Sequence, residues 1–222
     1  MRVLVVSANV GKTPEEIAYS FVFDEVARLA RRGVEVHVAR FRYGGSDLSH
    51  GVFFHDVPRR EVLRLPRELR KLPAYPWRAL PGNPRALAAE LLYGGHVERI
   101  ARRVRPDIIH AHFAYLEGWA AYLAKAAGGL EAPLVVTLHG YDILVEPSVG
   151  YGVRLHKRYS LLVERVLRRA DAVIAASRAV YREAVKVRGS DKGVHLIPNG
   201  VDTERFNPGL DGTPIRRLHG IE

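Results

Sequence analysis

The sequence predicts an α/β fold in which a doubly wound, Rossmann-like parallel sheet carries helices on both faces. Two observations predict it. Short runs rich in β-branched residues alternate along the 222 residues with longer segments of helical periodicity. The runs also lack strict polar alternation, as expected of strands covered on both faces. The six predicted strands are Val3–Val6, Val34–Val38, Ile108–His110, Leu134–Leu138, Val173–Ala175 and Val194–Ile197.

The helical segments between these strands carry recognisable start signals. The first is predicted over Pro14–Arg32, with Thr13 as its N-cap and a proline at its first position. Two further helices are predicted over Val153–Arg169 and Arg178–Val187, the second capped by Ser177. Strand and helix thus alternate often enough to favour right-handed crossovers within one sheet.

Composition narrows the chemistry. A hydrophobic fraction of 47% is enough for a globular core, and no apolar run reaches the ~20 residues of a membrane span. The chain has no cysteine, which excludes disulfides, thiolate metal sites and cysteine nucleophiles. We expect a cytoplasmic protein. The absence of glutamine and the single methionine favour a thermophilic source.

The positive charge is concentrated in one stretch. The chain has a formal net charge of +10, and twelve Lys or Arg with only four Glu lie between Pro58 and Arg105. Five prolines between Asp56 and Asn83 exclude a long regular helix there. We expect this stretch to touch an anionic membrane or an acidic glycan; a merely solvated surface is the alternative. Its predicted contact residues are Arg64, Arg67, Arg70, Lys71 and Trp77.

Nucleic-acid binding is not expected, because no recognised motif accompanies the basic residues. A kinase-type phosphate loop is not expected either. Gly11 and Lys12 follow the first strand, but the position where that motif needs its first glycine holds Val6. The loop could still bind an anion at a helix N-terminus, or form a simple capping turn. Asn199 and Gly200 follow the last strand, where backbone N–H groups could form a second anion site.

Histidines follow two of the predicted strands, at the edge where ligands of parallel sheets bind. His110 and His112 should lie on one side of their strand. A metal site with His139 is disfavoured, because no carboxylate accompanies them at suitable spacing. Instead, one histidine should anchor within the sheet and the other should face the cleft. Gly140 would let a ligand approach His139, and Asp142 could orient its ring or bind a ligand hydroxyl.

Four blocks in order resemble glycosyltransferase family 4, which has the two-domain GT-B fold. They are residues 105–113 (RPDIIHAHF), 136–142 (VTLHGYD), 169–177 (RADAVIAAS) and 197–208 (IPNGVDTERFNP). The resemblance is to enzymes of the glycogen synthase and exopolysaccharide type. It implies a retaining hexosyltransferase of polysaccharide biosynthesis, acting on a glycan or polyprenyl-linked acceptor with a nucleotide sugar as donor and without a metal or cofactor.

The resemblance also implies roles for individual residues. His139 would be the catalytic residue, beside the reacting carbon of the donor sugar. The donor and its phosphates would be bound by Gly11, Lys12, Gly140, Asn199 and Gly200. The acceptor would be bound by Asn9, His110, His112, Phe113, Tyr141 and Asp142. The family often has paired glycines in the first loop, whereas this chain has Gly11 alone, so Lys12 would substitute as a point charge.

The expected domain organisation is half of such an enzyme. Residues 1–206 would form the Rossmann-like acceptor-side domain, and residues 207–222 would begin the linker to a C-terminal domain that binds the nucleotide. Glu90 and Glu98 match the spacing of that domain's two-glutamate motif, but they lie in the wrong half. We expect the domain to be inactive alone, because transfer needs donor and acceptor held together. A non-catalytic module that binds a glycan or a partner subunit is the alternative.

Overall fold

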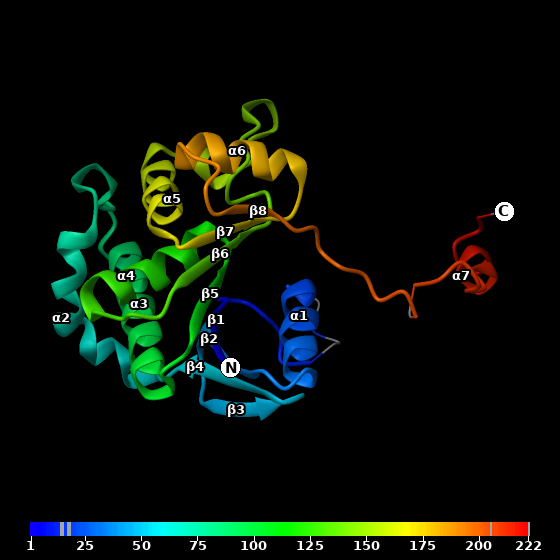
Figure 1. The fold of residues 1–222 in the computed structure, drawn as a ribbon, viewed down its shortest axis with the longest axis horizontal. Coiled ribbons are helices and arrows are strands. Elements are labelled where there is room, and N and C mark those ends of the chain that lie inside the picture. Colours follow the sequence, from blue (N-terminus) through cyan, green and yellow to red (C-terminus); the bar gives the residue numbers. More distant parts are fainter. Residues whose placement is uncertain (14–15, 17–18, 205, 222) are drawn as a thin grey trace.

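The computed structural model describes residues 1–13, 16, 19–204 and 206–221. It contains one eight-stranded sheet in the order β3-β4-β2-β1-β5-β6-β7-β8, with every neighbouring pair parallel except β3 and β4 (Figure 1). The strands are β1 (Arg2–Val6), β2 (Glu35–Tyr43), β3 (Ser46–Ser49), β4 (Val52–Val57), β5 (Ile108–His112), β6 (Leu134–Leu138), β7 (Ala172–Ala175) and β8 (Val194–Leu196). The predicted α/β class and parallel sheet are confirmed.

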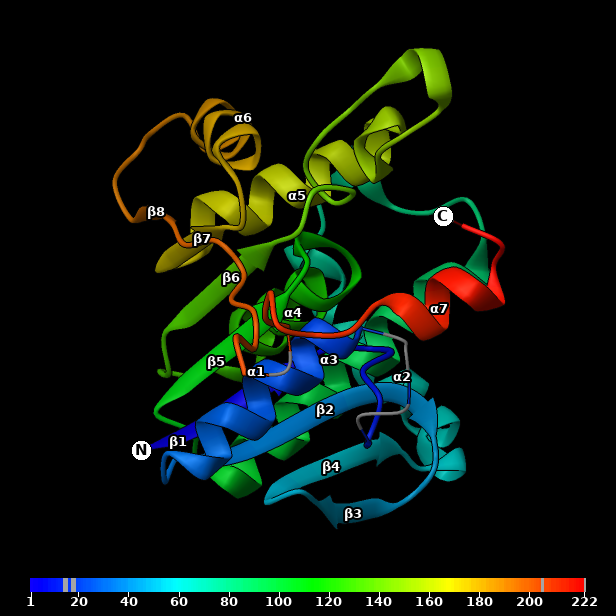
Figure 2. The same ribbon diagram turned by 90° about the vertical axis from the view of Figure 1, so that its right-hand side faces the viewer.

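Helices cover the two faces of the sheet unequally. They are α1 (Ser20–Arg31), α2 (Leu65–Glu68), α3 (Pro84–Val104), α4 (Trp119–Gly128), α5 (Lys157–Arg169), α6 (Arg178–Arg188) and α7 (Thr213–Leu218). Helices α3, α4, α5 and α6 bury their apolar residues in one core, while α1 packs on the opposite face over β1, β2 and β4 (Figures 1 and 2). The site described below lies on the α1 face.

Helix α1 begins later than the sequence suggested. Tyr19 adopts a left-handed conformation with φ of 53° and directly precedes Ser20, so the predicted N-cap at Thr13 is wrong. The predicted first helical position, residue 14, lies outside the described residues. By contrast, the predicted cap of α6 is confirmed, because the backbone N–H of Val180 donates to the hydroxyl of Ser177 at 3.2 Å.

The hairpin of β3 and β4 was not predicted. His50 and Gly51 form its two-residue turn with φ of 52° and 77°, the conformation that matches the twist of paired strands. The polar residues His55 and Asp56 hid the strand pattern of β4, although both side chains are buried. The hairpin extends the sheet beyond β2 and closes over the loop that follows β1.

The proline-rich stretch folds into short turns around buried ion pairs. Short 3₁₀ segments at Arg59–Arg64, Leu69–Ala74 and Trp77–Ala79 flank α2. Lys71 is completely buried, and its Nζ lies 2.7 Å from Oε2 of Glu98 in α3. The assignment of Lys71 to an outward basic surface is therefore wrong, because its charge is paired inside the domain. Arg70, on the surface, also pairs with Glu98.

The chain after β8 leaves the sheet. It runs as an extended segment to α7, which lies apart from the sheet at the right of Figure 1. Neither hydrophobic core contains a residue from α7, and its described residues are exposed. One ion pair, between Arg28 of α1 and Asp202 at 2.9 Å, ties the start of this segment to the α1 face.

Candidate functional site

The candidate site lies at the carboxyl ends of β5 and β6. These strands are parallel neighbours with His112 opposite Thr137, so the residues that follow them meet at one edge. Side chains alternate along β5, and His110 and His112 point to the α1 face with ring centroids 4.4 Å apart. The predicted common side of these two histidines is confirmed.

His139 follows β6 and lies in an aromatic surround. Its ring centroid is 4.6 Å from that of Phe21 and 4.6 Å from that of Phe113. Its Nε2 lies 3.1 Å from Nδ1 of His112. Burial lowers the pKa of His139 to about 4, so the ring is neutral at neutral pH. A neutral imidazole offers one N–H donor and one acceptor.

The loop that carries His139 is held by Asp142. The Oδ1 atom of Asp142 accepts hydrogen bonds from the backbone N–H groups of His139 and Gly140, both at 3.1 Å, and Oδ2 accepts from Ala114 N–H at 2.8 Å. Gly140 has φ of 120°, a conformation that residues with a Cβ rarely adopt. The expected roles of Asp142 toward the His139 ring or an acceptor hydroxyl are wrong, because this buried carboxylate binds backbone amides instead.

His110 and His112 are also too buried for the acceptor contacts expected of them. His110 is 8% exposed and His112 is 0% exposed. Nε2 of His110 lies 2.7 Å from the Thr137 hydroxyl, so His110 is the predicted anchor within the sheet. His112 does not face a cleft directly. Its Nδ1 contacts Nε2 of His139, which lies between His112 and the surface. Phe113 and the exposed Tyr141 remain candidates for ligand contact.

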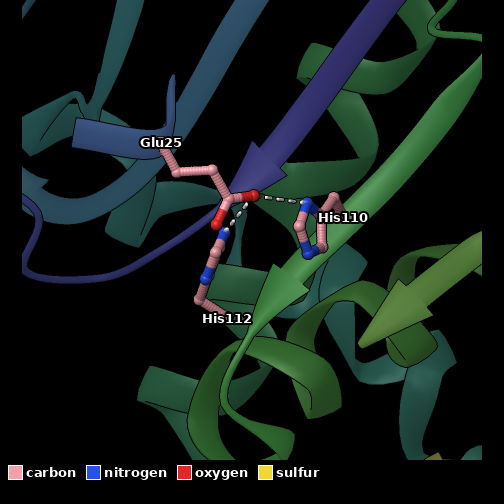
Figure 3. A group of neighbouring side chains, drawn as sticks. All are labelled: Glu25, His110 and His112. Atoms are coloured by element: carbon pink, nitrogen blue, oxygen red, sulfur yellow. Dashed lines mark ion pairs between the residues drawn. The ribbon is translucent and has the colours of Figure 1, made fainter. Parts of the chain in front are cut away.

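A carboxylate that the sequence did not reveal joins the two histidines. Oε1 of Glu25, in α1, lies 3.6 Å from Nδ1 of His110 and 3.8 Å from Nε2 of His112 (Figure 3). The three side chains are close enough together to hold a metal ion. The sequence argument against a metal site rested on carboxylates close to the histidines in the sequence. Glu25 is 85 residues from His110 and is brought there by the packing of α1.

The side chains of the loop after β1 contact each other and the neighbouring strand β3. Nζ of Lys12 lies 3.2 Å from Asp47 in β3, and its backbone N–H donates to Oε1 of Glu16 at 3.0 Å. A Cβ on Gly11 would lie 2.4 Å from Cβ of Glu16, so this glycine permits packing within the loop. The point charge expected of Lys12 is therefore committed to an intramolecular ion pair. Asn9 is exposed beside it.

Glu117 is a second acidic residue that the sequence reading missed. It lies in the segment after β5, is buried, and its Oε1 accepts a hydrogen bond from the backbone N–H of Ala8 at 3.2 Å. Burial raises the pKa of Glu117 to about 7. A carboxyl group that titrates near neutral pH thus supports the loop after β1. In the sequence, the one indication of a role for Glu117 is its position between the histidines of β5 and the start of α4.

A groove opens beside these residues on the α1 face. It has a volume of about 690 Å³ and lies between α1, the uncovered ends of β6 and β7, and the segment after β8. Glu25, Thr137, Asn199 and Gly200 are among its lining residues. The predicted donor residues Asn199 and Gly200 thus share one groove with Glu25, whereas the Gly11–Lys12 loop is not part of its lining.

The model of Glycosyltransferase Family 4 matches residues 20–205 of this sequence. The chain belongs to Glycosyltransferase Family 4. It is 32% identical over 166 residues to TuaC of Bacillus subtilis (strain 168), a putative teichuronic acid biosynthesis glycosyltransferase. This alignment covers 69% of this chain and 40% of that protein. It is 26% identical over 199 residues to N-acetyl-alpha-D-glucosaminyl L-malate synthase of Bacillus anthracis, covering 87% and 44%.

Solved structures of GT-B enzymes share the fold. A sucrose-phosphate synthase from Thermosynechococcus elongatus superimposes with a TM-score of 0.64 at 15% identity, covering 100% of this chain and 53% of that one. Anabaena Alr3699/HepE in complex with UDP and glucose superimposes with a TM-score of 0.61 at 17% identity, covering 99% and 50%. The sheet described above is therefore the N-terminal Rossmann-like half of a GT-B fold, as expected.

The match covers only part of each relative. This family member spans about two fifths of the curated relatives and about half of the solved chains. Within the described ranges, no helix is both long and apolar enough to cross a membrane.

Proposed function

We propose that this chain forms the acceptor-side half of a retaining hexosyltransferase that moves a hexose from a nucleotide sugar to a glycan or lipid-linked acceptor. The observation that carries the proposal is His139, which lies at the carboxyl end of β6 in a family 4 domain with a neutral ring and a backbone held by Asp142. Solved neighbours of the same fold were obtained with UDP or UDP-glucose, which supports a nucleotide-sugar donor.

His139 is suited to contact the donor sugar. Because its Nε2 is hydrogen-bonded to His112, its Nδ1 is the ring atom left to meet a ligand. A neutral ring nitrogen can hydrogen-bond a sugar hydroxyl beside the reacting carbon without adding a charge. Gly140 keeps the adjacent backbone free of a Cβ, which lets the donor approach closely. Backbone N–H groups at Asn199 and Gly200, which line the groove, would then contact the donor phosphates. A contact from Gly11 would need the donor to extend beyond this groove toward the loop after β1.

The chemistry would need a second half-site. In the proposed arrangement, residues 1–206 bind the acceptor and position His139, residues 207–222 lead toward a nucleotide-binding domain, and the isolated half turns over little. Holding the two reactants together supplies much of the rate in such reactions. The non-catalytic alternative is not favoured, because the relatives that match this chain are named as transferases and synthases.

The stretch around α2 supports peripheral attachment at the cytoplasmic face of a membrane. Leu63 is 78% exposed and Trp77 is 75% exposed, and the exposed Arg64 and Arg67 lie within about one helical turn of Leu63 in the sequence. Exposed apolar and aromatic side chains interleaved with arginines are typical of surfaces that lie on anionic lipid. Such attachment would bring a lipid-linked acceptor to the site.

Turnover of nucleotide sugars by the chain joined to the reading frame that follows it tests the proposed role of His139. His139→Ala should lower the transfer rate about 100-fold, as loss of one group that stabilises a transition state does. The matched control is His195→Ala, because His195 is an exposed histidine at the end of the same sheet, in β8. Equal activity of the two variants would remove His139 from the mechanism.

A further inference from the structure

Glu25, His110 and His112 converge on one point from two elements of the fold. Figure 3 shows the carboxylate of Glu25, from α1, reaching between the two imidazoles of β5. Its Oε1 lies 3.6 Å from one ring nitrogen and 3.8 Å from the other. Both distances exceed the 2.7–3.2 Å of ordinary hydrogen bonds, so a hydrogen bond does not account for the convergence.

The second nitrogen of each ring already has a partner. Nε2 of His110 lies 2.7 Å from the Thr137 hydroxyl, and Nδ1 of His112 lies 3.1 Å from Nε2 of His139. If these nitrogens donate, the lone pairs of both rings point at Glu25. Metal-binding histidines usually have this arrangement, in which the other ring N–H donates to a neighbouring acceptor and fixes the tautomer.

The nitrogen of His112 that faces Glu25 is buried without a partner. His112 is 0% exposed, and across residues 1–13, 16, 19–204 and 206–221 its Nε2 finds no hydrogen-bond partner. A buried polar atom left unsatisfied is costly and is rare in proteins.

We propose that Glu25, His110 and His112 form a binding site for a divalent first-row transition ion, with Zn²⁺ as the ion best suited to it. In a tetrahedral zinc site with bonds of about 2.0–2.1 Å, two ligand atoms lie about 3.3 Å apart. The two separations from Glu25 are a few tenths of an ångström longer, which its half-exposed side chain can take up. All three ligand atoms lie within 4.8 Å of one another, so the two imidazoles would also move closer together around an ion. Two imidazoles and one carboxylate form a common ligand set for zinc.

The fourth ligand position would face solvent. Glu25 and Thr137 line the groove on the α1 face, so a water molecule or a ligand oxygen could reach the ion from there. Mg²⁺ is a poor fit, because it prefers six oxygen ligands in octahedral geometry. The site is built entirely from side chains of this chain and does not depend on the proposed transferase activity.

An ion at this site would set the protonation of His139. Nε2 of His112 would bind the ion, so Nδ1 of His112 must carry the proton and donate to Nε2 of His139. The proton of the His139 ring would then sit on Nδ1. Without the ion, the opposite arrangement is equally compatible with the 3.1 Å contact, because either ring can donate across it.

Calorimetric titration of the chain with Zn²⁺ tests the site. We expect one ion per chain, with affinity lowered more than tenfold by Glu25→Gln and by His110→Asn and unchanged by His195→Ala. Glu25→Gln is the safer variant for folding, because Glu25 is half exposed on α1. Co²⁺ should give the visible absorption of a tetrahedral complex, and Mg²⁺ should not compete. No Zn²⁺ binding by the wild type, or equal binding by Glu25→Gln and the wild type, would overturn the proposal.

Nitrogen-15 NMR of the histidine rings provides a readout that a general effect on folding would not give. Addition of Zn²⁺ should shift the ring nitrogens of His110 and His112 and place the His139 proton on Nδ1. Shifts confined to exposed histidines such as His50 and His195 would show surface binding and refute the site.

Discussion

The carboxylate of Asp142 holds the backbone of His139: its Oδ1 accepts the His139 N–H at 3.1 Å, and the Asp142 side chain is buried. The same side chain accepts from Gly140 and Ala114, so one residue fixes the ends of the loops after β5 and β6. The position of the candidate catalytic ring therefore depends on a residue that does not face the ligand.

Asp142→Ala should destabilise the domain strongly. It leaves three backbone N–H groups without their acceptor, and each buried unsatisfied group costs about 1–3 kcal/mol, so we expect a loss of about 3 kcal/mol or more in the free energy of unfolding. Asp171→Ala is the matched control, because Asp171 also accepts from a backbone N–H, that of Leu134 at 2.7 Å. Its side chain is 56% exposed, so water can replace it. Similar losses in urea unfolding of the two variants would contradict this assignment.

Glu117 should make the domain less stable as pH rises. Burial raises its pKa in the folded state to about 7 from a reference value of 4.5. The folded state therefore holds this proton more tightly, so its contribution is full below about pH 4.5 and is lost as the pH rises to 7. The loss corresponds to about 3 kcal/mol at ~1.4 kcal/mol per pKa unit.

Glu117→Gln isolates this effect, because the amide can still accept from Ala8 but does not titrate. The stability of the variant relative to the wild type should increase between pH 4.5 and 7.5 in chemical unfolding. Glu35→Gln is the control of opposite sign, and its effect on the pH dependence falls below pH 4.5. Arg2 lowers the pKa of Glu35 to about 2, so that contribution is present above pH 4.5 and lost in acid. A constant difference between Glu117→Gln and wild type across this range would refute the assignment.

The burial of Lys71 predicts a structural role. Lys71→Met removes the fully buried cation from between Glu68 and Glu98. These buried carboxylates are then left with the more exposed Arg70, Arg99 and Arg102 as partners. Breaking a buried ion pair from one side costs about 3–5 kcal/mol. Arg102→Met removes a 56% exposed partner of the same Glu98 and should cost less than about 1 kcal/mol. Thermal unfolding of both variants checks the difference. If Lys71→Met leaves the stability unchanged, this lysine is not buried in solution.

Membrane attachment should depend on the exposed residues near α2. Co-sedimentation with vesicles containing anionic lipid should decrease when Leu63 and Trp77 are changed to Ser, and when Arg64 and Arg67 are changed to Glu. Of the two contributions to vesicle binding, we expect salt to weaken only that of the arginines, because ions screen charges but not apolar contacts. The control is the pair Arg182→Glu and Lys186→Glu, two exposed cations on α6. If the control weakens sedimentation equally, or if the wild type does not sediment, the proposed attachment is wrong.

Much of the fold could be predicted because local pattern and buried sheet agree. All six predicted strands occur, and Ser177 caps α6 as its chemistry suggests. The hairpin of β3 and β4 was missed because buried polar side chains such as Asp56 break the apolar pattern. Asp56 is tolerated there because Arg40 forms a two-point ion pair with it at 2.6 and 2.8 Å.

The site was harder to predict because its chemistry depends on tertiary contacts. The histidines were found from their place at strand ends, but their burial was not, since it depends on how α1 and the His139 loop pack. Glu25 and Glu117 carry no motif. Lys71 was assigned to the surface because the sequence shows its charge but not that the Glu98 carboxylate pairs with it in the interior. A thermophilic source stays a prediction.

The central claim is tested most directly by transfer and hydrolysis with a panel of nucleotide sugars. The assay compares the chain alone with the chain joined to the reading frame that follows it in its genome. We predict turnover of a hexose donor in the joined form, little in the chain alone, and loss of about 100-fold on His139→Ala. Absence of turnover in both forms, or turnover that is unchanged in His139→Ala, would contradict the account.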